Sequence, residues 1–400
     1  MINRLIPVAD RLLGVEEYYF SKKLQEIDEL NRKGERVINL GVGSPDLAPP
    51  ENVVKVLIAS AENPQNHGYQ GYRGIADLRN AFAAWYDKYF NVQLDPEREI
   101  LPLMGSKEGI MHITMAFVNK GDEVLVPNPG YPTYAAAAKL SGGTVKTYNL
   151  SEENGWIPDL KNLGKTNLSK VKLMWINYPH MPTGAIANRE DLRNLIAFAY
   201  KNNIILVNDN PYAFILNETP LSLLENRTGE DHVVELNSLS KSHNMSGWRV
   251  GVVAGNPRLI DRIVQFKSNM DSGMFLPIQM AATRALEEKS DWYEKQNRTY
   301  AKRSVFAREI ATLLNCSYAE VTAGMFIWAK IPAEWDSAES LSDSILQDAR
   351  VFITPGQIFG SQGRRYIRLS LCSPKEDWQA ALKRISSIRK EIKDQKRKRA

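Results

Sequence analysis

The chain has 400 residues, of which 43% are hydrophobic and 24% charged, as expected for a globular protein long enough for two domains. The net charge is +5, and much of the excess lies in the tail 390–399, a run more typical of a solvated helix end than of a nucleic-acid site. Cys316 and Cys372 are too few for a disulfide framework or a cysteine metal centre, and they suit a reducing compartment. No apolar run is long enough to span a membrane, and the N-terminus lacks a signal-peptide core. We therefore expect a cytoplasmic protein that binds neither membrane nor nucleic acid, and no metal site.

The first part of the chain predicts a helix over residues 16–33 and a short strand over 37–40, with Gly41 and Gly43 directly after the strand. Two glycines allow a backbone to approach a ligand closely, but the third glycine of a dinucleotide fingerprint is missing. A loop rich in tyrosine and glycine, residues 69–74, then leads into a helix that runs through Tyr86.

A phosphate site is predicted where the strand 99–104 meets the helix 110–118. Gly105, Ser106 and Lys107 lie between the two. Free amide groups at a helix N-terminus and the helix dipole both attract an anion. An ordinary turn between a strand and a helix has a similar sequence, so this pattern alone leaves both readings open.

Strands and helices alternate through the middle of the chain. The predicted strands are 123–126, 144–148, 172–176, 204–207, 232–236 and 249–253, and the predicted helices are 132–140 and 190–202. This order predicts an α/β domain with a mostly parallel sheet and ligands at the strand ends. Residues 257–296 are predicted to be helical, and strands at 326–331, 351–353 and 366–371 indicate a smaller α+β domain.

Lys241 lies in a short polar stretch between two of the predicted strands, with Ser238, Ser240 and Arg249 near it. One use for such a lysine is a Schiff base with an aldehyde, while the hydroxyls and the arginine hold a phosphate. A solvated loop lysine is the alternative. The spacing Ser238-x-x-Lys241 also matches the serine nucleophile of penicillin-binding enzymes, but the Ser-Asp-Asn and Lys-Thr-Gly segments of that motif are absent.

Three other strand ends supply matching chemistry. Asp209 could pair with a pyridinium nitrogen, and Tyr212 could donate to a phenolate on the same ring. Tyr131 could stack on a flat heterocycle. The segment 177–184 follows a further strand, and each feature alone could be an ordinary cap, core aromatic or turn.

Together these residues resemble the class I/II aminotransferases of fold type I, the aspartate aminotransferase-like enzymes that use pyridoxal 5′-phosphate. The motif Ser-x-Ser-Lys…Gly-x-Arg-x-Gly carries the resemblance, which covers the chain from Val37 to about Ile388. It implies a large domain with a mostly parallel seven-stranded sheet sandwiched by helices (49–287), a small α+β domain (15–48 and 288–400) and an N-terminal arm (1–14).

The resemblance also implies a role for each candidate residue. Lys241 would form the Schiff base and move the proton between the substrate Cα and the cofactor C4′, with Asp209 and Tyr212 as its catalytic partners. The other cofactor-binding residues would be Gly105, Ser106, Lys107, Tyr131, Asn177, Ser238, Ser240 and Arg249 of one subunit and Tyr69 of the other. Gly43 and Arg368 would bind the substrate α-carboxylate, for which a bidentate arginine is well suited. A homodimer with shared sites follows from the role of Tyr69.

One position departs from the family pattern. Relatives usually read Asn-Pro-Thr-Gly, where the asparagine donates to the ring phenolate, but this chain has Met181. A thioether cannot donate a hydrogen bond. We therefore expect a raised pKa of the cofactor Schiff base, unless Asn177 or His180 substitutes for the missing donor.

The expected reaction moves an amino group between an L-amino acid and a 2-oxo acid, with 2-oxoglutarate as one acceptor. Two segments, residues 105–110 and 8–12, resemble the corresponding segments of family members that act on alanine, aspartate, methionine or diaminopimelate. No arginine lies beside residues 269–273, which argues against strict dicarboxylate specificity. The alternatives are a C–S β-lyase of the same fold and, in a different class, a transcription regulator, for which no N-terminal DNA-binding extension is present.

Overall fold

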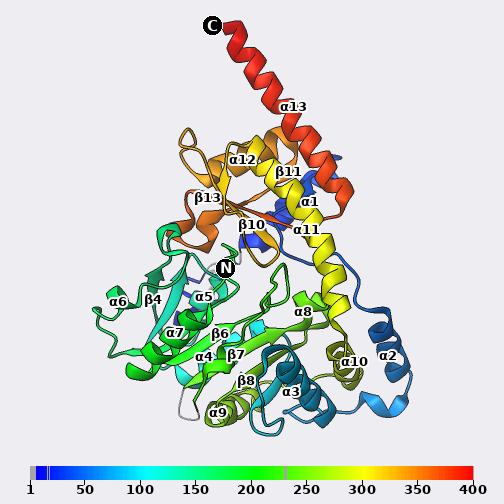
Figure 1. The fold of residues 1–400 in the computed structure, drawn as a ribbon, viewed down its shortest axis with the longest axis vertical. Coiled ribbons are helices and arrows are strands. Elements are labelled where there is room, and N and C mark those ends of the chain that lie inside the picture. The colour runs from blue at the N-terminus through cyan, green and yellow to red at the C-terminus, as the bar shows by residue number, and fades with distance from the viewer. Residues whose placement is uncertain (1–5, 16, 18, 229–231, 400) are drawn as a thin grey trace, which may run out of the picture.

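The computed structural model describes residues 6–15, 17, 19–228 and 232–399, and side chains as far as residue 388. At its centre is a seven-stranded sheet (Figure 1). In spatial order its strands are β2 (Ile100–Leu103), β8 (Gly251–Gly255), β7 (Val233–Ser238), β6 (Ile205–Asp209), β5 (Val171–Ile176), β3 (Glu123–Asn128) and β4 (Thr144–Asn149). Only β8 runs antiparallel to its neighbours. The predicted α/β fold with a mostly parallel sheet is confirmed.

Helices cover both faces of this sheet. Side chains alternate between the faces, so Trp175 packs into one core while Met174 packs into the other. The first core also receives α4 (Ser106–Phe117), α5 (Pro132–Leu140) and α9 (Pro257–Lys267). The second receives α2 (Glu51–Ala61), α3 (Ala76–Phe90), α7 (Arg189–Lys201) and α10 (Leu276–Leu286). Strands buried on both faces explain why their sequences are almost continuously apolar.

A smaller unit joins the beginning of the chain to its end, as the blue and the orange-to-red segments of Figure 1 show. Its four-stranded antiparallel sheet has the order β12 (Thr354–Pro355), β13 (Tyr366–Ser370), β10 (Phe326–Lys330) and β9 (Ser317–Tyr318). The parallel pair β1 (Ile38–Asn39) and β11 (Val351–Phe352) lies beside it. Its helices are α1 (Tyr19–Arg32), α11 (Ser290–Leu313), α12 (Ala338–Ala349) and α13 (Lys375–Arg399). One hydrophobic cluster contains side chains from all these helices.

The structure corrects several predicted boundaries. The single helical stretch expected over 257–296 consists of α9, α10 and the start of α11, because Gly273 has a positive φ of 83° and Pro277 starts a new helix. The helix expected from residue 110 begins earlier, at Ser106. The helices α2 and α12 were not predicted. Residues 1–5, 16 and 18 of the predicted arm and first helix lie outside the described residues.

No helix in the described part of the chain is both long enough and apolar enough to cross a membrane. The tail 390–399 continues α13 as backbone, and its side chains lie outside the described set.

Candidate active site

A cavity of about 690 Å³ lies where the ends of the central strands face the smaller unit. Twelve of the predicted site residues line it: Gly43, Ser106, Lys107, Tyr131, Asn177, Asp209, Tyr212, Ser238, Ser240, Lys241, Arg249 and Arg368. They come from segments up to 325 positions apart in sequence (43 to 368), so only the fold brings them together.

Lys241 lies on the one-turn helix α8 (Leu239–Ser242), which begins where β7 ends. The Ser238 hydroxyl caps this turn by accepting a hydrogen bond from the Ser240 amide at 3.2 Å. The Lys241 Nζ donates to the Gly43 carbonyl at 2.7 Å, which joins the lysine to the loop after β1. Burial lowers the pKa of Lys241, so a larger fraction of the amine is neutral and nucleophilic.

The predicted phosphate site is built around two glycines. Gly105 has a φ of 83°, and a Cβ atom there would lie 2.1 Å from Nη2 of Arg249. A Cβ at Gly251 would lie 2.8 Å from the Ser106 amide nitrogen. The guanidinium of Arg249 therefore packs directly over the Gly105 backbone, and its Nη1 donates to the Ser240 hydroxyl at 3.3 Å.

Lys107 is the second residue of α4. The N-terminal end of this helix, with Ser106 and Lys107, borders the cavity. Its pKa is lowered, mainly by burial and also by the nearby Arg249 guanidinium. Two cations beside a helix N-terminus and a glycine backbone make an anion site.

Asp209 is the last residue of β6 and its side chain is buried. The Tyr134 hydroxyl donates to its Oδ2 at 2.8 Å, whereas its Oδ1 is buried without a hydrogen-bond partner. Burial raises the pKa of Asp209 to about 6, although the tyrosine hydrogen bond opposes this. A buried carboxylate oxygen without a donor is costly, so this site is suited to a cationic N–H group.

Arg368, on β13, is buried among aromatic rings. Its guanidinium carbon lies 4.1 Å from the ring centre of Phe326 and 4.6 Å from that of Phe359. Its Nη2 donates to the Gly41 carbonyl at 2.8 Å, and its Nη1 approaches the Met181 sulfur at 3.4 Å. Sulfur is a weak acceptor, so a carboxylate could displace this contact at low cost.

Asn177 and His180 differ in their relation to the cavity. The Asn177 side chain lines it but also accepts from the Met181 amide at 2.7 Å and donates to the Asp209 carbonyl. His180 is buried outside the lining, where its Nδ1 lies 2.8 Å from the Thr183 hydroxyl. Burial lowers the pKa of His180 to about 3. Of the two substitutes considered for the missing donor, only Asn177 faces the cavity.

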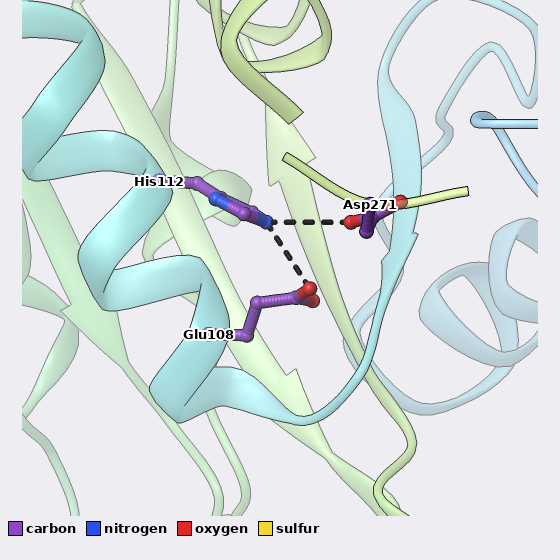
Figure 2. A group of neighbouring side chains, drawn as sticks. All are labelled: Glu108, His112 and Asp271. Atoms are coloured by element: carbon purple, nitrogen blue, oxygen red, sulfur yellow. Dashed lines mark ion pairs between the residues drawn. The ribbon is translucent and has the colours of Figure 1, made fainter. Parts of the chain in front are cut away.

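A second cluster of titratable side chains, Glu108, His112 and Asp271, joins α4 to the segment after α9 (Figure 2). His112 Nε2 lies 3.2 Å from Glu108 Oε1 and 3.8 Å from Asp271 Oδ2. The spacing would suit a metal ion, but both Asp271 oxygens already accept from Lys267 Nζ, at 2.6 and 2.7 Å. We interpret the cluster as a buried charge network that ties the start of α4 to the turn at 271–273.

Two predicted cofactor-binding residues lie outside the cavity lining. Gly105 borders it through Arg249, as described above. Tyr69 is 94% exposed and does not line the cavity of its own chain. Conversely, sequence reasoning missed Tyr134, although its position three residues after Tyr131 at a helix start places both on one face.

The comparisons with known proteins agree with this geometry. The family model of aminotransferase class I and II matches residues 35–385. An LL-diaminopimelate aminotransferase of Dehalococcoides mccartyi is 38% identical over 384 residues, which cover 96% of this chain and 99% of that protein. The enzyme of the same name from Aquifex aeolicus is 38% identical over 95% of this chain and 99% of its own length.

Solved structures match over similar lengths. Apo-BacF from Bacillus subtilis has a TM-score of 0.91 at 35% identity, covering 96% of this chain and 98% of its own. A mutant aspartate aminotransferase of Thermus thermophilus, 23% identical, shares the fold with a TM-score of 0.88 over 96% of this chain and all of its own. The chain therefore belongs to the aminotransferase class I and II family, and it is a pyridoxal-phosphate-dependent enzyme that moves an amino group between an L-amino acid and a 2-oxo acid.

Proposed function

We propose that transamination takes place in the cavity around Lys241, with 2-oxoglutarate as one acceptor. The observation that carries this proposal is that one cavity is lined by both a basic and an acidic group: the partly buried Lys241 amine and Asp209, whose Oδ1 has no hydrogen-bond partner. The two relatives described above are both named as LL-diaminopimelate aminotransferases, so they give the β-lyase alternative no support.

The described residues fit the cofactor. Asp209 Oδ1 needs a cationic donor, which a protonated pyridine nitrogen would provide. The glycines at 105 and 251 let Arg249 and the β8 backbone pack close to the start of α4, where Lys107 also lies and where a phosphate would bind. Tyr212 and Tyr131 line the same cavity as candidates to contact the ring. When bound, the cofactor supplies an aldehyde and an electron sink for the Cα carbanion.

Two side chains of this protein would act on the substrate, one in proton transfer and one in binding. The amine of Lys241 would take the proton from the substrate Cα and hold it at Nζ, because burial lowers its pKa and leaves a larger fraction of the amine neutral. Arg368 holds the α-carboxylate in place of its contact with Met181, and the backbone at Gly43 borders that position. This grip fixes which Cα bond faces the lysine.

We also propose a cytoplasmic homodimer in which Tyr69 completes the partner's phosphate site. The 94% exposure of Tyr69 supports this, since so exposed a loop phenol is available to a neighbouring subunit. We also propose that each subunit has a small domain, residues 15–48 and 288–400, and a large cofactor-binding domain, residues 49–287. Mixing Tyr69→Phe and Lys241→Ala subunits should restore activity above that of either variant alone, and unchanged activity would argue against shared sites.

Replacement of the lysine tests the central proposal. Lys241→Ala should lose turnover and the visible absorbance of the bound cofactor, and borohydride should no longer fix the cofactor to the protein. Lys139→Ala is a matched control, because Lys139 bonds to the Gly14 carbonyl outside this cavity. Retention of turnover by Lys241→Ala would contradict the proposal.

A further inference from the structure

The charged groups of the cavity are strongly unbalanced. Among the described residues that line it, four carry a basic side chain and one carries an acidic side chain. The acid is Asp209, whose Oδ2 is bonded to Tyr134 and whose Oδ1 is the proposed partner of the cofactor ring. Among the described residues that line the cavity, therefore, no carboxylate is left to pair with a further ammonium group.

The walls around Arg368 are mostly apolar. Phe20 and Leu24 of α1, Val42, and the rings of Phe326 and Phe359 close the side of the cavity around Arg368. An ammonium group placed against these side chains would lose its hydration without meeting a carboxylate.

From this distribution we propose that the enzyme takes L-amino acids with an apolar side chain and discriminates against donors that carry a second ammonium group. The inference rests on the proposed function, because it assumes that Arg368 binds the α-carboxylate and thereby directs the side chain along these walls. The proposed substrate preference differs from the substrate in the relatives' names, since diaminopimelate has an ammonium group at both ends.

Matched substrate pairs that differ only in the distal ammonium group test the proposal. The rate constant for conversion of the holoenzyme's cofactor absorbance is measured with L-norleucine against L-lysine, and with L-2-aminopimelate against LL-2,6-diaminopimelate. We expect kcat/KM to be on the order of 100-fold higher for the member of each pair that lacks the ammonium, because a buried polar group left unpaired discriminates strongly. Ratios below threefold in both pairs, or faster reaction of diaminopimelate, would overturn the proposal.

Binding without chemistry gives an independent readout. Calorimetry with the holoenzyme should find hexanoate bound at least tenfold more tightly than 6-aminohexanoate, and equal affinities would count against the proposal.

A charge added to the wall identifies the surface responsible. Leu24→Asp should raise the lysine-to-norleucine ratio of kcat/KM at least tenfold, whereas Gln25→Asp, exposed on the same helix but outside the cavity lining, should leave it unchanged. No difference between the two variants would overturn the assignment of this wall to the substrate side chain. If no amino acid changes the cofactor absorbance, the proposed function itself fails, whereas reaction of lysine and diaminopimelate at full rate defeats only the present inference.

Discussion

The two ends of the active-site cavity bury charge in different ways. At the cofactor end, Asp209 has one hydrogen-bonded oxygen and one without a partner. At the substrate end, Arg368 is packed against aromatic faces and bonded to the Gly41 carbonyl. The first group is destabilised until a cationic ligand arrives, whereas the second is already stabilised by its surroundings.

This difference follows from where the groups originate. The cofactor end is formed by loops at the carboxyl ends of parallel strands, which present backbone amides and short polar side chains. The substrate end comes from the antiparallel sheet of the smaller unit, whose inward side chains are core residues. The cavity lies between a parallel and an antiparallel sheet. Its cofactor end is therefore polar, and its substrate end, which would receive the amino-acid side chain, is mostly apolar.

Among variants that separate the two ends of the cavity, the largest effect is expected at Arg368. Arg368→Leu removes the bidentate partner of the α-carboxylate, so kcat/KM should fall on the order of 1000-fold, or about 4 kcal/mol of transition-state stabilisation. Steady-state kinetics with an apolar amino acid measures this. Arg365→Leu is the control, since Arg365 bonds to the Pro332 carbonyl outside the cavity. Equal losses in both variants would show that the effect is structural.

The next effect concerns Asp209 in the cofactor-free protein. Its pKa is raised from 3.8 to about 6, so the folded state binds the proton more tightly than the unfolded chain. Relative to Asp209→Asn, this contributes stability below about pH 4 that is lost as pH rises through about 6, in total about 3 kcal/mol. Urea unfolding of both apoproteins between pH 4 and 7 checks this, and a pH-independent difference would refute it.

A smaller effect is expected at the phosphate site. Gly105→Ala combines a strained φ with a clash against Arg249, so cofactor affinity should fall roughly 10- to 100-fold. The loss should be larger for pyridoxal 5′-phosphate than for pyridoxal. Gly121→Ala has the same strain, with a φ of 95°, but nothing within 4 Å of the added carbon, and it should bind both ligands normally. Similar losses for both ligands would argue against a phosphate role.

The smallest effect lies at Met181, where the two ends meet. Met181→Asn introduces a hydrogen-bond donor near the ring, so the pH midpoint of the cofactor's visible absorbance should fall by about one unit. Met181→Leu, which has no donor, should keep the wild-type midpoint. An unchanged midpoint in Met181→Asn would mean that Asn177 already supplies the bond.

Most of the cofactor end could be predicted from sequence because its residues lie at strand ends and turns, where local patterns are informative. Ser238 through Lys241 and the glycine at 105 are examples. Tyr134 and the aromatic rings around Arg368 were missed, because aromatic residues in apolar segments look the same whether they line a core or a cavity.

The alternation of strands and helices in the large domain, the lysine between two buried strands and the acid at the end of a third could be predicted from local patterns. These features depend on periodicity and turn chemistry over a few residues. Three features became visible in the folded structure alone: the bond from Lys241 to the Gly43 carbonyl, the unpartnered oxygen of Asp209, and the lack of an acid among the described residues around Arg368. Those facts depend on contacts between segments hundreds of residues apart, which no local pattern encodes.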